Sequence, residues 1–392
     1  MYNFARNLPA SGIRKFYDLA NSLQKQGHDI LHMEIGRPVW KIPQQMKDFL
    51  NEAMNNDIYH YMDNRGDRLL REVLCNNIYT KTKKKYNPDT EIIVTTGASE
   101  GLAMCALALL GHDDEVIIPE PAWPHYKAVA ELAGAKAITV DLPSDQDFII
   151  DPAEIRKVIS SKTKMLVLNN PNNPTGAVQP KKVLQELANL AEKHGFYILA
   201  DEVYDHFIYD NNCFISMAEI MGSSDRLIYL NSLSKTYSIT GWRVGYVCCN
   251  PILSDAFNKI HQYLTVCGVS TVHYAVSKFI QSDKNADFLS KMIQEFSRRR
   301  NVWAENIHSC GNFSYSPPSG AFYLFPRFSY AGLNSEQFCE YMLSEEHICM
   351  VPGAVFGAGF DDHVRISFSG TIDTQLKAQK KLMSFFNKIK GA

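Results

Sequence analysis

The sequence predicts an α/β protein whose large domain is a mostly parallel β-sheet covered by helices on both faces. Between about residues 91 and 249, short apolar runs alternate with helix-like stretches. Runs that are apolar on both faces are typical of buried parallel strands. The chain has 392 residues, enough for two domains of the usual size, roughly 100–200 residues each. We expect a large domain over residues 45–278 and a smaller α+β domain formed by residues 1–44 and 279–392.

The expected strands of the large sheet are short, apolar and separated by helix-like segments. They are residues 92–94, 116–118, 137–140, 165–168, 196–200, 227–230 and 244–248. In the C-terminal part, charged helical stretches around residues 291–306 precede two more strand candidates, residues 322–325 and 364–368. Because ligands of such sheets bind beyond the carboxyl ends of the strands, the residues that follow these runs are the first candidates for a site.

Charge and cysteine content exclude several classes of function. The chain carries 40 basic and 42 acidic residues, so no strong field is present to hold nucleic acid or an anionic membrane. The nine cysteines show no metal-ligand spacing, and we expect them to be reduced, buried and structural. The longest apolar run, near residues 103–110, is far shorter than a membrane span, and residues 1–11 lack the apolar core of a signal peptide. We expect a cytoplasmic enzyme that acts on small molecules.

Two ionisable residues directly follow expected strands. Lys235 lies in Ser-Leu-Ser-Lys-Thr-Tyr (232–237), just past the run 227–230. An amine at the edge of a sheet can be partly desolvated and made nucleophilic, as a Schiff-base lysine requires. Asp201 follows the run 196–200 and is expected at the same edge. Together the amine and the carboxylate predict a site for an organic cofactor.

A glycine-containing turn joins the first expected strand to a helix. In Gly97-Ala98-Ser99-Glu100-Gly101, free backbone amides and hydroxyls would face outward at a helix N-terminus, where phosphate is the natural ligand. The alternative is a simple turn in which Ser99 caps the helix. The same residues also match the Gly-x-Ser-x-Gly nucleophile elbow of serine hydrolases.

The hydrolase alternative makes a specific geometric prediction. Ser99, Asp201 and His363 stand in the chain order of a hydrolase triad and would have to meet. Against this alternative, the chain has no glycine-rich oxyanion segment of the His-Gly-Gly-Gly type, and a hydrolase leaves Lys235 unexplained.

Four short strings occur in an order that is specific to one family. Asn-Pro-Thr-Gly (173–176) is followed by Asp-Glu-Val-Tyr (201–204), then by Ser-x-Ser-Lys (232–235) and Arg243. Taken alone, the first string is an ordinary turn. Together the strings resemble the class I/II aminotransferases of pyridoxal-phosphate fold type I, the aspartate aminotransferase superfamily, and the resemblance extends over residues 35–367. It implies bound pyridoxal 5'-phosphate, a homodimer, and transfer of an amino group from an L-amino acid to a 2-oxo acid.

The resemblance also implies roles around the cofactor ring. Lys235 matches the Schiff-base lysine and the general base and acid of the reaction. Asp201 matches the carboxylate that keeps the pyridine nitrogen protonated, so that the ring can accept electrons. Asn173 and Tyr204 match the positions that hydrogen-bond the ring's 3-oxygen. Trp123 matches the aromatic that stacks on the ring, although a core tryptophan is the alternative.

Further matches concern the phosphate, the neighbouring subunit and the substrate. Tyr61 resembles the tyrosine that reaches the phosphate of the other subunit, with a plain surface tyrosine as the alternative. Arg365 matches the arginine that binds the substrate α-carboxylate, with Gly36 and Asn173 beside it, on a small domain that closes over the substrate. The phosphate group is matched by Ala98, Ser99, Ser232 and Arg243.

The sequence leaves the outcome of the reaction and the substrate side chain open. A pyridoxal-phosphate-dependent carbon–sulfur β-lyase is the nearest alternative, and a non-catalytic cofactor sensor is another, although no helix-turn-helix module precedes the core. Where many relatives read Gly-x-Pro-Asp-Phe, this chain has Gly-Arg-Pro-Val-Trp (36–40). Trp40, His125 and Tyr126 would suit an apolar or aromatic side chain, whereas Arg37 would suit an acidic one.

Overall fold

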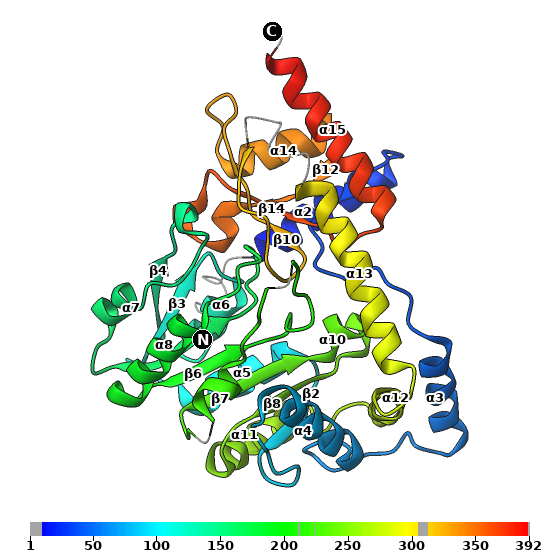
Figure 1. The fold of residues 1–392 in the computed structure, drawn as a ribbon, viewed down its shortest axis with the longest axis vertical. Helices are drawn as coiled ribbons and strands as arrows, with labels where there is room; N and C mark the ends of the chain where they lie inside the picture. The colour runs from blue at the N-terminus through cyan, green and yellow to red at the C-terminus, as the bar shows by residue number, and fades with distance from the viewer. Residues whose placement is uncertain (1–9, 211, 223, 305–312, 391–392) are drawn as a thin grey trace.

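A seven-stranded sheet forms the centre of the larger part of the molecule (Figure 1). The computed structural model describes residues 10–210, 212–222, 224–304 and 313–390. The strand order is β2-β8-β7-β6-β5-β3-β4, with β8 antiparallel to both neighbours and every other pair parallel. The expected α/β class and mostly parallel sheet are therefore confirmed. The strands are β2 (Ile92–Thr95), β3 (Glu115–Glu120), β4 (Lys136–Asp141), β5 (Thr163–Asn169), β6 (Tyr197–Asp201), β7 (Leu227–Ser232) and β8 (Gly245–Cys248).

Helices cover both faces of this sheet because alternate strand residues point to opposite sides. In β2, Ile93 packs into one core cluster, while Ile92 and Val94 pack into the other. The first face is covered by α5 (Ala98–Leu109), α6 (His125–Leu132) and α11 (Pro251–Leu264). The second face is covered by α4 (Arg68–Thr82), α8 (Lys181–His194), α9 (Met217–Met221) and α12 (Ser270–Ile280). Helix α3 (Gln44–Asn55) packs on α12. The remaining helical segments of this part are α7 (Pro152–Val158), α10 (Leu233–Thr236) and the short 3-10 turns η1 (Ser144–Gln146) and η2 (Thr240–Trp242).

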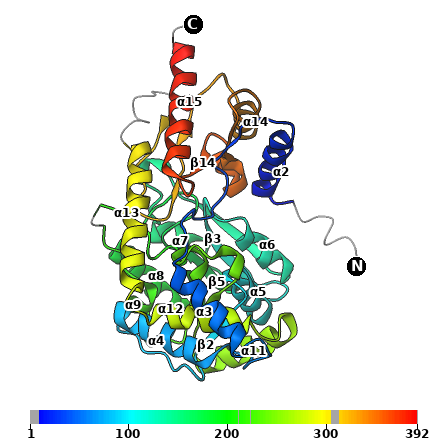
Figure 2. The ribbon, with the colours of Figure 1, turned by 90° about the vertical axis from the view of Figure 1, so that its right-hand side faces the viewer.

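A smaller α+β part lies above the large sheet and combines both ends of the described chain (Figure 2). β1 (Leu31–His32) pairs in parallel with β12 (Ile348–Cys349), which joins an early segment to a late one. The long helix α13 (Asn285–Ala304) runs from the level of the large sheet up to α15 (Ile372–Lys390). The division of the chain at residues 44 and 279 stays a prediction. The remaining elements are α2 (Gly12–Lys25), β9 (Phe313–Ser314), β10 (Tyr323–Leu324), β11 (Arg327–Phe328), α14 (Ser335–Glu345), β13 (Val351–Pro352), η4 (Gly353–Phe356), η5 (Ala358–Phe360) and β14 (Val364–Ser367).

The register of the sheet brings polar side chains together at one edge. Asn169 and Asp201 are paired neighbours at the ends of β5 and β6, and the side-chain amide of Asn169 donates to the Asp201 carbonyl over 3.0 Å. β7 ends next to them at Ser232, and α10 begins at once. A parallel sheet collects ligand-binding groups at this edge.

Two further findings concern the whole described chain. None of its helices combines the length and the apolarity that crossing a lipid bilayer requires. All of its cysteines are free thiols. Six of them are buried, but Cys213 is exposed and Cys267 is partly exposed, so the expectation that they are all buried is wrong at these two positions. Cys310 lies outside the described residues.

Candidate active site

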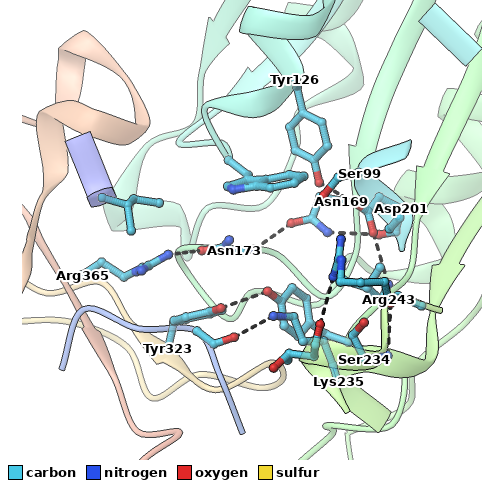
Figure 3. A pocket seen from close by; sticks show the side chains of 18 residues that line it. Ser99, Tyr126, Asn169, Asn173, Asp201, Ser234, Lys235, Arg243, Tyr323 and Arg365 are labelled. Carbon is cyan, nitrogen blue, oxygen red and sulfur yellow. Dashed lines mark hydrogen bonds between the residues drawn. The ribbon is translucent and has the colours of Figure 1, made fainter. Parts of the chain in front are cut away.

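One pocket between the two parts of the molecule gathers all the residues that the resemblance matches to the cofactor or the substrate carboxylate, except Tyr61 (Figure 3). Arg365 and Tyr323, from the smaller part, lie on one side of the pocket, and Asp201 and Arg243, from the larger part, lie on the other. The predicted residues that line it are Gly36, Ala98, Ser99, Trp123, Asn173, Asp201, Tyr204, Ser232, Lys235, Arg243 and Arg365.

Lys235 enters the pocket from α10, directly after β7. Its Nζ donates a hydrogen bond to the carbonyl oxygen of Gly36 over 2.6 Å. Burial, together with the positive charges of Arg365 and Arg243, lowers the pKa of the Lys235 amine to about 8, against the opposing effect of Asp201. About a tenth of this amine is therefore uncharged at pH 7, and the uncharged form is the one that attacks a carbonyl carbon.

Asp201 is a nearly inaccessible carboxylate at the end of β6, with only 2% of the residue exposed. One carboxylate oxygen accepts a hydrogen bond from the Tyr126 hydroxyl over 2.6 Å, and the other accepts one from the Val203 amide over 3.2 Å. Burial raises the pKa of Asp201 to about 6, against the opposing effects of these two donors and of Lys235. A buried carboxylate of this kind is stabilised by any cation that enters the pocket.

The start of α5 and Arg243 form a cradle for an anion. Gly97 has a φ of +78°, and a Cβ there would lie 2.4 Å from the Arg243 Nη2 atom, so the close approach requires glycine. Arg243 donates to the carbonyl oxygens of Thr240 and Thr96 over 3.1 and 3.4 Å. Ala98 and Ser99, the first two residues of α5, line the same pocket. Backbone amides at a helix N-terminus together with a guanidinium group suit a phosphate.

Hydroxyl groups complete this cradle. Ser232 Oγ donates to the Val244 carbonyl over 3.0 Å and accepts from the Ser234 amide over 3.1 Å. Ser234 Oγ is buried, lines the pocket and has no hydrogen-bond partner among the described residues. A buried hydroxyl without a partner is costly, so this oxygen points to a ligand.

On the opposite wall, Arg365 is 2% exposed and held in place from several sides. Its Nη1 donates to Asn173 Oδ1 over 3.0 Å, and its Nη2 donates to the carbonyl oxygen of Glu34. The guanidinium carbon lies 4.6 Å from the ring centre of Tyr323 and 4.9 Å from that of Phe356. A rigid, buried guanidinium in a ligand pocket is suited to bind a carboxylate.

Comparison with known proteins decides the family. Residues 31–380 match the family model of aminotransferase class I and II. The chain belongs to this family. It is therefore an aminotransferase, which moves an amino group between an amino acid and a 2-oxo acid, and the family depends on pyridoxal phosphate.

Individual relatives of this aminotransferase are similar over nearly their whole length. An aspartate aminotransferase of Pyrococcus abyssi is 34% identical, over 95% of this chain and 94% of the relative. The aromatic-amino-acid aminotransferase 2 of Thermococcus litoralis is 33% identical, also over 95% of this chain and 94% of the relative. The crystal structure of an aspartate aminotransferase from Thermotoga maritima superposes with a TM-score of 0.92 at 32% identity, covering 99% of this chain and 100% of that one.

The aminotransferase pocket does not form the triad that the hydrolase alternative requires. Ser99 and Asp201 line the pocket, but His363 does not. The His363 Nδ1 atom lies 2.6 Å from Asp362 Oδ1, and its ring stacks on Phe325 at 5.0 Å. The hydrolase alternative is therefore wrong.

Among the residues matched to the cofactor or the substrate carboxylate, Tyr61 alone lies elsewhere. Trp40 and His125, expected as walls near the substrate side chain, do not line the pocket either. Tyr61 is 87% exposed and lines a separate surface depression together with Met54, Tyr59 and residues 267–271. Its expected contact belongs to a neighbouring subunit, so its role stays a prediction.

Six residues that line the aminotransferase pocket have no role predicted from the sequence: Ile13, Asn169, Val203, Ser234, Thr240 and Tyr323. Tyr323 falls in a correctly expected strand, but its hydroxyl lies 2.9 Å from that of Tyr204, a contact that no local pattern predicts. The sequence predicts Tyr126 only as a wall residue near the substrate side chain. Its place on the first turn of α6, after Trp123, was the signal that it also faces the pocket and Asp201.

Proposed function

We propose that this aminotransferase binds pyridoxal 5'-phosphate in the described pocket and acts in the cytoplasm as a homodimer on an L-amino acid and a 2-oxo acid. The observation that carries the proposal is the arrangement of three groups in one pocket. An amine with a lowered pKa, a buried carboxylate with a raised pKa and an anion cradle each match a different part of the cofactor.

The residues of the pocket fit this cofactor. Lys235 would hold its aldehyde carbon, and Asp201 would face its ring nitrogen. The phosphate would lie in the cradle, where Ser234 offers the buried hydroxyl that has no partner among the described residues. Trp123 would cover the ring, and Asn173 and Tyr204 would face the ring hydroxyl. The phosphate would also contact Ala98, Ser99, Ser232 and Arg243.

When bound, the cofactor supplies an electrophilic carbon for the substrate nitrogen and a ring that withdraws electrons from the substrate. Asp201 holds a proton on the ring nitrogen through its negative charge. The freed amine of Lys235 would take the proton from the substrate Cα at Nζ and would give it to the cofactor carbon that Lys235 had held, so that the amino group stays with the cofactor. Arg365 binds the α-carboxylate with its two Nη groups and orients the Cα–H bond, with Gly36 leaving room for the backbone beside Tyr323.

A homodimer is supported by an apolar surface around Tyr61. The side chain of Asn64 donates to the Val266 carbonyl over 2.6 Å, which joins the Tyr61 segment to the end of α11. Exposed apolar residues gather on both sides of this contact, and a second copy that covered them would bring Tyr61 to the neighbouring phosphate. The free thiols are those expected in a reducing compartment such as the cytoplasm. The exposed apolar residues are Met54, Tyr59, Tyr61, Tyr263, Leu264, Val266 and Val269.

The direct test is Lys235→Ala beside Lys259→Ala, a change at a mostly exposed lysine of α11. We expect the first variant to lose transamination while its circular dichroism and thermal midpoint stay close to those of the wild type, and the second to keep full activity. Substantial transamination by Lys235→Ala would refute the assignment. Pyruvate and ammonia released from a cysteine conjugate without any 2-oxo acid would favour the lyase instead.

A further inference from the structure

The structure assigns a task to every cation of the pocket. Among the described residues that line it, only Lys235, Arg243 and Arg365 carry a positive charge. In the proposed function, which this inference rests on, they bind the aldehyde carbon, the phosphate and the α-carboxylate respectively. None of these three described cations is left over for a second carboxylate on the substrate.

Arg37, the residue that could attract an acidic substrate, lies outside this pocket. It lines a separate surface cleft beside Val39 and Lys377. The segment around it is fixed from both sides, because the Val39 amide donates to the Ser369 carbonyl over 2.8 Å and Ser238 Oγ donates to the Pro38 carbonyl over 2.6 Å. The Arg37 side chain thus lines this cleft and not the pocket that would hold the substrate.

The pocket has one aliphatic side chain on its Arg365 side, that of Ile13. Ile13, in the first turn of α2, lines the pocket and packs against the buried cluster that includes Phe325, Phe356 and Phe360. Phe356 is also the ring beneath the Arg365 guanidinium. A substrate held by Arg365 thus has hydrocarbon, not charge, beside it.

The Tyr61 segment, which is proposed to reach the pocket from a second copy of the chain, adds no positive charge there. Around Tyr61 the sequence reads Tyr-His-Tyr-Met (59–62), without lysine or arginine. The nearest arginine in sequence, Arg65, is occupied within its own chain, since its Nη1 donates to Ser254 Oγ over 2.6 Å.

We propose that the preferred amino-acid substrate has an uncharged, apolar side chain, such as that of phenylalanine, leucine or methionine, and that Ile13 contacts it. An aspartate or glutamate side chain would place a carboxylate in a desolvated pocket that already contains Asp201. A buried carboxylate without a cationic partner is strongly disfavoured. An apolar side chain would instead gain from burial against Ile13.

The test is the half-reaction of the cofactor-loaded enzyme with single amino acids, followed by the change in cofactor absorbance. We expect the rate constant divided by the dissociation constant to be at least about tenfold higher for phenylalanine or leucine than for aspartate or glutamate. Equal or faster reaction with the acidic amino acids would overturn the inference. An enzyme that reacts with no amino acid would contradict the proposed function, and this inference with it.

Two variants make the test specific. Ile13→Arg should shift the ratio of the two rates toward aspartate by at least about tenfold, whereas Leu19→Arg, at a 40% exposed position of the same helix, should leave it unchanged. If Ile13→Arg does not fold, Arg37→Ala still tests whether an acidic side chain has a cationic partner. We expect Arg37→Ala to leave the aspartate rate within about twofold of the wild type, and a tenfold loss would show that Arg37 binds the acidic side chain.

Discussion

Replacing Asp201 by Asn should stabilise the cofactor-free protein while it destroys activity. Burial raises the pKa of Asp201 from 3.8 to about 6, which corresponds to about 3 kcal/mol at pH 8, because one pKa unit is worth about 1.4 kcal/mol. The folded pKa lies above the unfolded one, so the folded state binds more protons between about pH 4 and 6. Stability therefore falls as the pH rises through this window, and the penalty is complete above it.

An Asn side chain at position 201 has no charge and avoids this penalty, but it offers only one acceptor oxygen where Asp201 offers two. Both Asp201 oxygens accept hydrogen bonds, from Tyr126 and from Val203, and one mismatched bond costs about 1 kcal/mol. We expect a net gain of about 1–2 kcal/mol in the free energy of unfolding at pH 8, which shrinks as the pH is lowered toward 4.

The assay is urea unfolding of the cofactor-free wild type and variant at several pH values. Asp255→Asn is the control, since that exposed carboxylate has a pKa lowered by Lys259 and its replacement should bring no gain at pH 8. A variant at Asp201 that is less stable than the wild type at pH 8, with no dependence of the difference on pH, would refute the reasoning.

Three further predictions concern the amine, the guanidinium and the cradle. Because burial lowers the pKa of Lys235 to about 8, the rate at which cofactor-free protein takes up pyridoxal phosphate should rise with pH and level off above about pH 8. Stopped-flow absorbance measures this rate, and a rate that keeps rising toward pH 10 would contradict the prediction. Arg365→Lys should lower kcat/KM by about a hundredfold or more without changing cofactor affinity, because a lysine cannot bind a carboxylate with two parallel bonds; near-normal kinetics would show that Arg365 does not bind the substrate. His261→Leu removes a buried ring whose Nδ1 lies 2.7 Å from Glu100 Oε1, and Glu100 also accepts a hydrogen bond from the Thr96 amide of the cradle. We expect cofactor titration to show severalfold weaker binding, and the free energy of unfolding to fall by about 1–3 kcal/mol. Unchanged cofactor affinity would mean that the cradle does not depend on the His261–Glu100 pair.

The large sheet and the centre of the site could be predicted because both depend on local sequence. Apolar runs of strand length mark buried parallel strands, and the carboxyl ends of such strands meet at one edge. Lys235 and Asp201 each follow such a run directly, so their convergence in one pocket follows from the topology. The order of β8 in the sheet, antiparallel between β2 and β7, carries no such signal.

Contacts between distant segments could not be predicted. Ile13 reaches the pocket only because α2 packs against the segments around β12 and β13. A Cβ at Gly36 would lie 2.0 Å from the Tyr323 hydroxyl, so this glycine is required by a residue far away in the chain. The position of Arg37 in a separate cleft is likewise a result of tertiary packing, and the sequence alone left its role open.

The most direct measurement is borohydride reduction of the pyridoxal-phosphate-loaded protein, followed by proteolysis and mass spectrometry of the peptides. The account predicts that the reduced cofactor is attached to Lys235 alone, and that the cofactor-loaded Asp201→Asn variant carries the same label but is inactive. A label on another lysine, or no stable label on protein that has taken up the cofactor, would contradict it.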